Sequence, residues 1–248
     1  MPESGDIYRI GRHRLLCGDA RDPSAYRELL GDDIPALLFT DPPYGVGYEG
    51  GHFHSNNVHI KRARKPIEGD TNSDMYAQFL PVAVPFLRGP AYCFFSDSES
   101  ESVYRAVRQS GCKVHSQIIW HKTNAKYAAI GQRYKQRHEC ILFFKPKGTT
   151  LLWTGPGNER TIWDIPRDAR NAYHPSQKPI ALAARALSNH DASVVLDPFL
   201  GAGSTLLAAE QAGRMCLGME IDPYYVQVCL DRFAAAGLPA TLLRKGDR

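Results

Sequence analysis

The residues of this sequence best suited to chemistry stand together at Asp41-Pro42-Pro43-Tyr44. Asp41 offers a carboxylate acceptor, and Pro42 is held extended because another proline follows it, which fixes the direction of its carbonyl. Tyr44 adds a flat face for stacking. Two acceptors beside an aromatic ring suit a planar ring that carries an exocyclic NH2 group, because that group has two hydrogens to donate. A strand followed by a proline-rich turn is the simpler alternative, and these four residues alone do not exclude it.

The element that positions this group is the apolar run 35–40, which directly precedes Asp41. A short apolar run that stops at a Pro-Pro pair is typical of a buried strand of a parallel sheet. In open α/β sheets, ligands bind at the carboxyl ends of the strands. The sequence therefore predicts that Asp41 lies at a ligand-binding edge.

A second group of functional residues lies far downstream. A predicted strand ends in Asp197 and is followed by a turn with Gly201 and Gly203, a helix, and another strand that ends in Glu220. Glu220 stands 19 residues beyond Gly201 (220 − 201). That is about the offset at which a nucleotide-binding βαβ unit places the carboxylate that accepts hydrogen bonds from ribose hydroxyls.

The turn does not fit a dinucleotide. The sequence from Gly201 reads Gly-Ala-Gly-Ser-Thr-Leu, so the third glycine of the dinucleotide fingerprint is absent, which disfavours a nicotinamide oxidoreductase. Asp197 would repel a pyrophosphate but suits a cofactor with a cationic ammonium group. S-adenosylmethionine carries a ribose, an adenine, an ammonium and a sulfonium.

The totals describe an ordinary globular chain. Its 248 residues suffice for one well-buried α/β domain, and 43% of them are hydrophobic and 23% charged. The N-terminus has no apolar signal core and no run approaches membrane-spanning length, so we expect a cytoplasmic protein without membrane contact. The six cysteines stand singly without a C-x-x-C pair, which predicts reduced, buried side chains and neither a disulfide framework nor a zinc site. Three histidines (His52, His54 and His59) lack partners at ligand spacing, so no metal is expected.

The net charge of +4 is unevenly distributed. Between Lys113 and Lys147 there are eight Lys or Arg residues and one acid, Glu139, and a second basic cluster spans 61–65. Such clustering favours a polyanionic partner, although a basic run is often only a solvated face.

Hydrophobic patterning predicts the remaining elements. Residues 7–16 predict a strand pair, and 22–30 a helix capped by Asp22 with Pro23 at its first position. Residues 45–74 show no period and predict a mobile loop beside the Asp41 group. Helices are expected at 75–87, 98–110 and 180–189, strands at 91–95 and 114–120, an antiparallel partner strand at 140–144, and an irregular cover at 148–173.

Four segments together resemble the motifs of DNA amino-methyltransferases, which methylate adenine N6 or cytosine N4. They are Asp41-Pro-Pro-Tyr44, His174-Pro-Ser-Gln-Lys-Pro179, Asp197-Pro-Phe-Leu-Gly-Ala-Gly-Ser-Thr205 and Gly218-Met-Glu-Ile-Asp-Pro-Tyr-Tyr225. Their order, with the catalytic motif before the cofactor motif, is that of the β (permuted) subclass. The resemblance implies a single α/β domain over residues 1–248 with the Rossmann-like methyltransferase fold, a seven-stranded, mostly parallel sheet with one antiparallel strand and helices on both faces.

The resemblance also implies the roles of individual residues. The catalytic group would be Asp41, Pro42, Pro43 and Tyr44. The S-adenosylmethionine site would comprise Asp19, Ala20, Lys178, Asp197, Phe199, Gly201, Gly203, Ser204, Thr205, Glu220 and Ile221. Within that site, Glu220 would bind the ribose and Asp19 the adenine amine, and Lys178 with Thr205 the carboxylate end of the cofactor.

The implied reaction is methylation of adenine N6 in DNA after the base has flipped out of the duplex. In the resembled family, aspartate at the first motif position usually accompanies adenine and serine accompanies cytosine. Methylation of cytosine N4, methylation of RNA and a catalytically inactive binding protein are the alternatives. DNA contacts are expected from segments 122–137 and 148–173 and, by charge, from Lys61, Arg62, Arg64, Lys65, Lys122, Lys126, Arg133, Lys135 and Arg137. Members of the family often form homodimers, and a restriction enzyme is a possible partner that the sequence does not reveal.

Overall fold

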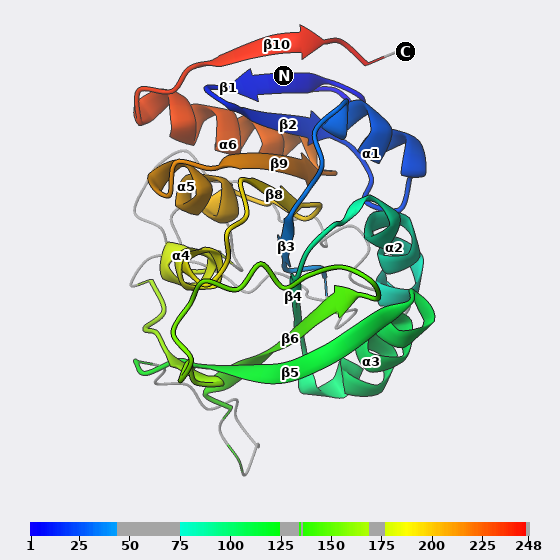
Figure 1. The fold of residues 1–248 in the computed structure, drawn as a ribbon. Helices are drawn as coiled ribbons and strands as arrows, with labels where there is room; N and C mark the ends of the chain where they lie inside the picture. Colours follow the sequence, from blue (N-terminus) through cyan, green and yellow to red (C-terminus); the bar gives the residue numbers. More distant parts are fainter. Residues whose placement is uncertain (44–74, 125–133, 135, 169–176, 247–248) are drawn as a thin grey trace.

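The computed structural model describes residues 1–43, 75–124, 134, 136–168 and 177–246. These residues form one sheet whose strands lie in the order β10-β1-β2-β9-β8-β3-β4-β6-β5-β7 (Figure 1). The strands are β1 Ile7–Ile10, β2 His13–Cys17, β3 Leu37–Thr40, β4 Ala91–Phe95, β5 Cys112–His121, β6 His138–Pro146, β7 Ile162–Asp164, β8 Val194–Asp197, β9 Met215–Glu220 and β10 Ala240–Arg244.

Seven neighbouring strands, in the spatial order β2-β9-β8-β3-β4-β6-β5, match the expected sheet. Among them β6 alone runs antiparallel to its neighbours. The described residues form ten strands rather than seven. The strands β1 and β10 extend the sheet beyond β2, and β7 pairs in parallel with β5 at the other edge. The predicted strand pair at 7–16 is confirmed as β1 and β2. The expected irregular cover at 148–173 is wrong in part, because it contains β7.

Helices cover both faces of the sheet, as predicted (Figure 1). Helices α1 (Pro23–Leu30), α2 (Met75–Ala83) and α3 (Ser100–Gln109) pack on one face, and α4 (Ile180–Ser188), α5 (Ser204–Gln211) and α6 (Pro223–Ala235) on the other. Short 3-10 turns, η1 (Val84–Phe86) and η2 (Asp97–Glu99), follow α2 and β4. No helix in the described ranges is long and apolar enough to cross a membrane.

Strand alternation divides the core into two layers. In β3, Leu38 packs with α1 to α3, whereas Leu37 and Phe39 pack on the side of α4 to α6. Both sets are buried because helices cover both faces of the parallel sheet. All six cysteines are buried and free, as the sequence predicted.

Two helices begin with the same capping arrangement directly after strands that reach the site. The Asp22 carboxylate accepts a hydrogen bond from the Ser24 backbone N–H at 2.8 Å, and the Asp222 carboxylate accepts one from the Tyr224 N–H at 2.9 Å. A proline occupies the first turn of each helix, where its missing N–H costs no hydrogen bond. These caps fix where the chain turns from β2 into α1 and from β9 into α6.

Candidate active site

A cavity of about 360 Å³ opens at the carboxyl ends of the central parallel strands. The chain leaves β8 towards β9 on one side and β3 towards β4 on the other, so the cavity lies where the connections diverge, as in other open α/β sheets. Most of the predicted site residues that the structure describes line it: Asp19, Ala20, Asp41, Pro42, Pro43, Lys122, Lys178, Asp197, Phe199, Gly201, Ser204, Thr205, Glu220 and Ile221.

Glu220 closes the turn between β8 and α5. One of its carboxylate oxygens accepts a hydrogen bond from the Gly201 N–H at 2.9 Å, and the other accepts one from the Asp222 N–H at 2.9 Å. Gly201 has a φ of +54°, which a residue with a side chain adopts at a cost. Burial raises the pKa of Glu220 to about 7, against the pull of these two backbone bonds.

Asp197 lies at the end of β8 and is 3% exposed. Its carboxylate accepts hydrogen bonds from the Thr40 hydroxyl at 2.9 Å and from the Phe199 N–H at 3.1 Å. Burial raises the pKa of Asp197 to about 6, while hydrogen bonds, among them one from Thr205, act in the opposite direction. A buried acid of this kind is stabilised in its charged form by a cationic ligand.

Asp19 follows β2 and also faces the cavity. Its carboxylate forms an ion pair with Arg21, with Oδ2 and Nη2 2.6 Å apart. Burial raises the pKa of Asp19, but the bonds from Arg21 outweigh it and leave the pKa below its usual value. Ala20 is fixed beside it, because the buried Tyr26 hydroxyl donates to the Ala20 carbonyl at 3.0 Å.

Lys178 lies against Asp41, although the resemblance assigned it to the carboxylate end of the cofactor. Its Nζ is 2.5 Å from Oδ2 of Asp41 and 3.1 Å from Oε2 of Glu139. The other oxygen of Glu139, Oε1, is 2.6 Å from Nζ of Lys122. A row of alternating charges thus runs along one wall of the cavity.

Sequence reasoning missed several lining residues, including Phe39, Trp120, Glu139, Arg167 and Gln177. Trp120 ends a predicted strand, so the rule that ligands bind at strand ends could have found it. Glu139 lies near the beginning of the antiparallel strand and reaches the cavity from that end. Only the three-dimensional pairing of β6 with β4 and β5 brings it there.

Gly203 belongs to the packing between α5 and α6 and does not line the cavity. It has a φ of +84°, and a Cβ at this position would lie 2.7 Å from Sγ of Cys229 and 2.9 Å from Cε2 of Phe233. The resemblance had assigned it to the cofactor site, and the structure gives its lack of a side chain a packing reason.

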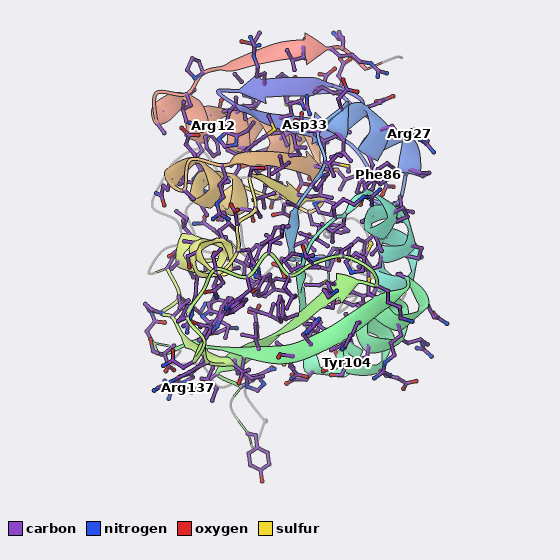
Figure 2. All side chains as sticks on the ribbon, in the orientation of Figure 1. Arg12, Arg27, Asp33, Phe86, Tyr104 and Arg137 are labelled. Atoms are coloured by element: carbon purple, nitrogen blue, oxygen red, sulfur yellow. The ribbon has the colours of Figure 1, made fainter. Side chains whose placement is uncertain are left out.

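The expected DNA contacts are only partly within the described ranges. Lys122 lies in the cavity wall, whereas the exposed Arg137 lies outside the cavity and donates to the Thr123 carbonyl at 2.9 Å. Figure 2 shows Arg137 at the end of the molecule opposite Arg12 and Arg27. Tyr44, Lys61, Arg62, Arg64, Lys65, Lys126, Arg133 and Lys135 lie outside the described residues, as does the whole of the predicted 45–74 loop.

Comparison with known proteins identifies the family. The N6_N4_Mtase model, described as DNA methylase, matches residues 36–231, which span both the Asp41 group and the Asp197–Glu220 turn. The chain belongs to this family of DNA methylases. It is 26% identical over 246 residues to the type II methyltransferase M.HpaI of Haemophilus parainfluenzae, an alignment that covers 88% of this chain and 73% of the relative.

Solved structures agree with the family assignment. TTHA0409, a DNA modification methylase of Thermus thermophilus complexed with S-adenosyl-L-methionine, is 27% identical with a TM-score of 0.60, covering 90% of this chain and 93% of that one. The PvuII cytosine-N4-specific DNA methyltransferase shares the fold at 18% identity and a TM-score of 0.67, covering 90% of this chain and 87% of that one. The expected methyltransferase fold is confirmed.

S-adenosyl-L-methionine is the cofactor of this DNA amino-methyltransferase. The cavity fits it in chemistry, since Asp197 is a buried carboxylate that a cationic ligand would stabilise, and Glu220 offers acceptors with a pKa near neutrality.

Proposed function

We propose that the protein methylates the N6 amine of adenine in DNA. The observation that carries the proposal is that one cavity joins Asp41 and Pro42 to Asp197 and Glu220. Acceptors for a substrate amine and carboxylates for a cationic, ribose-bearing cofactor therefore open to the same space. The motif order further supports assignment to the β (permuted) subclass.

The target amine needs activation because its lone pair is delocalised into the adenine ring. Hydrogen bonds from its two N–H groups to the Asp41 carboxylate and the Pro42 carbonyl would draw the nitrogen towards tetrahedral geometry and stabilise the positive charge that develops on attack. The cofactor supplies a methyl group bound to a positively charged sulfur. Asp41, or a water beside it, would take the proton that the methylated amine releases.

Positioning supplies much of the remaining acceleration, since the amine and the methyl group must lie in line. The amine is inaccessible inside a duplex, so the base has to flip into the cavity. Tyr44, outside the described residues, would stack on the flipped base. Contacts with the DNA phosphates are proposed for the basic residues of segments 61–65 and 122–137.

Aspartate at position 41 favours adenine. A carboxylate accepts a stronger hydrogen bond than the serine hydroxyl that usually accompanies cytosine. The same geometry would serve cytosine N4, and the fold shared with the PvuII enzyme is compatible with it. Cytosine N4 is therefore the second candidate.

The test is a product analysis. Purified protein is incubated with labelled S-adenosylmethionine and unmethylated DNA, with total RNA in a parallel reaction, and the nucleic acid is digested to nucleosides. We expect label in N6-methyldeoxyadenosine. N4-methyldeoxycytidine as the main product would refute the adenine assignment, and label only in RNA would refute the substrate class.

A further inference from the structure

Four alternating charges form a continuous row along the cavity wall: Asp41, Lys178, Glu139 and Lys122. Their side chains are between 12% and 21% exposed. The residues come from four separate segments. Asp41 follows β3, Lys178 precedes α4, Lys122 follows β5, and Glu139 lies near the start of β6. Glu139 is the centre of the row, because each of its oxygens contacts a different lysine.

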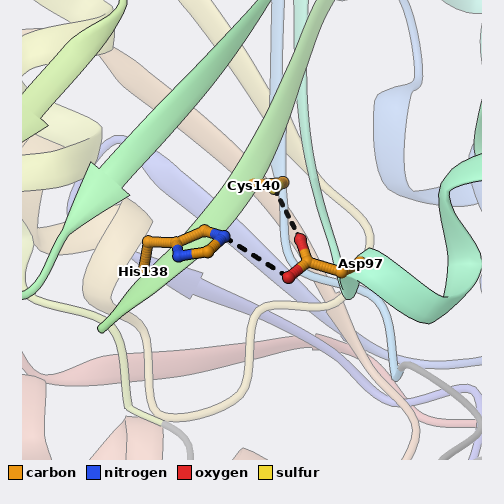
Figure 3. A group of neighbouring side chains, drawn as sticks. All are labelled: Asp97, His138 and Cys140. Carbon is orange, nitrogen blue, oxygen red and sulfur yellow. Dashed lines mark hydrogen bonds and ion pairs between the residues drawn. The ribbon is translucent and has the colours of Figure 1, made fainter. Parts of the chain in front are cut away.

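Contacts on the opposite face of the sheet fix the position of Glu139. Side chains alternate along a strand, so Glu139 points to one face of the sheet and its neighbours His138 and Cys140 to the other. Both neighbours contact Asp97, which follows β4 (Figure 3). Sγ of Cys140 donates to Asp97 Oδ1 at 3.0 Å, and Nε2 of His138 lies 3.3 Å from Oδ2. Gln136 also donates to Oδ2, at 2.7 Å.

These three side chains, Asp97, His138 and Cys140, are close enough together to resemble a metal site. The Asp97 carboxylate, Nε2 of His138 and Sγ of Cys140 already contact one another, and Gln136 and Gln117 also donate to the carboxylate and to the sulfur, the latter at 3.4 Å. Burial also raises the pKa of Cys140 to about 12, so its thiol stays protonated. The group therefore joins the start of β6, next to Glu139, to Asp97 after β4.

The charges in the row depend on one another. Burial alone would favour neutral Lys178, but Asp41 and Glu139 raise its pKa above the ordinary value. Burial likewise opposes ionised Glu139, yet Lys178 and Lys122 lower its pKa to about 2. Removing one partner of such a buried row leaves its neighbour with an uncompensated charge, which is costly.

We propose that Glu139 is a positioning residue for methyl transfer: through Lys178 it holds Asp41 as a carboxylate directed at the target amine. The inference rests on the proposed function, because it assigns Asp41 to that amine. It places Lys178 on the substrate side of the cavity, in contrast to a role at the carboxylate end of the cofactor. The two roles predict opposite effects on cofactor binding and turnover.

The experiment compares Glu139→Gln and Lys178→Met with the wild type and with Glu101→Gln. Glu101 is a matched control, because its carboxylate is 88% exposed on α3 and outside the cavity. Cofactor Kd is measured by calorimetry without DNA, and kcat by methyl transfer to DNA between pH 6 and 10. We expect both cavity variants to lower kcat by roughly 10- to 100-fold, the effect of misplacing a reacting group, with cofactor Kd within about twofold of wild type.

The pH profile separates positioning from a merely structural role. In Glu139→Gln, Lys178 stays buried but loses one anionic partner, so its pKa falls. In the wild type and in Glu101→Gln the alkaline limb of the kcat profile lies above pH 10, because the pKa of Lys178 is held above its ordinary value of 10.5. In Glu139→Gln, kcat should instead begin to fall within the measured range as the pH approaches 10. Should Glu139→Gln not fold, Glu139→Asp keeps the charge on a shorter side chain and should show a partial loss of kcat.

Three results bear against the proposals. If Lys178→Met weakens cofactor binding about tenfold and leaves kcat unchanged, Lys178 belongs to the cofactor site and the inference is overturned. A lower kcat with an unshifted pH profile would also overturn it, by reducing Glu139 to a structural residue. The activity of the wild-type protein on DNA is the reference for both results. If the wild type binds the cofactor normally but does not methylate DNA, the proposed function itself is refuted.

Discussion

At the scale of single residues, the carboxyl groups of the cavity have different pKa values because their surroundings differ. Asp197 and Glu220 have pKa values raised by burial to about 6 and about 7. Glu139 is also enclosed, but two lysines lower its pKa to about 2. The first two are acids that a cationic ligand or hydroxyl donors would help to ionise, and the third is a permanent anion that organises its lysine neighbours.

Asp41→Ala tests the residue that we propose faces the substrate amine. We expect methyl transfer to DNA to fall by about 10²- to 10³-fold, because one preorganised acceptor for the developing charge is lost. Cofactor Kd, measured by calorimetry, should change little, since Asp41 is assigned to the amine. Wild-type turnover in this variant would remove Asp41 from the mechanism.

Glu220 predicts a pH dependence of cofactor binding. Its folded-state pKa is about 7, above the ordinary value of 4.5, so the cofactor-free protein holds an extra proton between these values. Its contribution to stability is therefore present below pH 4.5 and is lost as the pH rises towards 7. A ribose-bound carboxylate requires the opposite, deprotonated form, so cofactor affinity should fall as the pH drops below about 7.

Calorimetry between about pH 6.5 and 8, a range that spans the Glu220 pKa, checks this expectation. Glu220→Gln should bind the cofactor about tenfold more weakly at the alkaline end, from the loss of charged hydrogen bonds worth roughly 1.5 kcal/mol. The fall in affinity towards pH 6.5 should also be smaller in Glu220→Gln than in the wild type. The same pH slope in the variant and the wild type would show that another group is responsible.

At the scale of elements, the contact between α5 and α6 supports the turn that carries Gly201. Gly203→Ala should destabilise the protein by about 2 kcal/mol, because its Cβ would meet Cys229 and Phe233 and the residue has a positive φ. Gly213→Ala is the matched control: Gly213 also has a positive φ, of +69°, but a Cβ there meets nothing within 4 Å. Equal losses in urea denaturation would show that backbone strain alone accounts for the effect.

The elements that the sequence predicted are those with strong local signals. β4 is a continuous apolar run, buried throughout, and α1 begins with the expected Asp22 cap and Pro23. β7 escaped prediction because it has three residues, of which only Trp163 is buried, and exists through pairing with β5. β10 escaped because most of its side chains are exposed, so no hydrophobic period marks it.

In the candidate site, too, the residues with a local sequence signal were predicted and the long-range contacts were not. Asp41, Asp197 and Glu220 lie at the ends of apolar strands, so sequence and sheet geometry together predicted that they share one edge. Lys178 and Asp41 were both found, but their ion pair was not, since a contact between residues 137 positions apart leaves no local pattern. Glu139 stood out in the sequence only as the single acid of a basic stretch.

At the scale of the whole molecule, we expect DNA to approach the cavity on the side where β5 ends and β6 begins, because the basic segment 122–137 connects these two strands. Arg137 belongs to that region, because its carbonyl accepts a hydrogen bond from the backbone N–H of Lys122, a cavity residue, at 2.8 Å. Arg27, on α1, lies at the opposite end of the molecule (Figure 2). Both side chains are exposed, so their charges differ mainly in position.

Arg137→Gln and Arg27→Gln therefore form a matched pair that removes one positive charge from either end. We expect only Arg137→Gln to weaken binding to a mixed-sequence DNA duplex and to reduce the slope of log K against log salt concentration by about 0.9, since each phosphate contact releases condensed counterions. Fluorescence anisotropy over a series of salt concentrations measures both quantities. Equal slopes for the two variants would mean that net charge, rather than a phosphate contact at Arg137, governs binding, and a reduced slope for Arg27→Gln alone would place the DNA on the other end of the molecule.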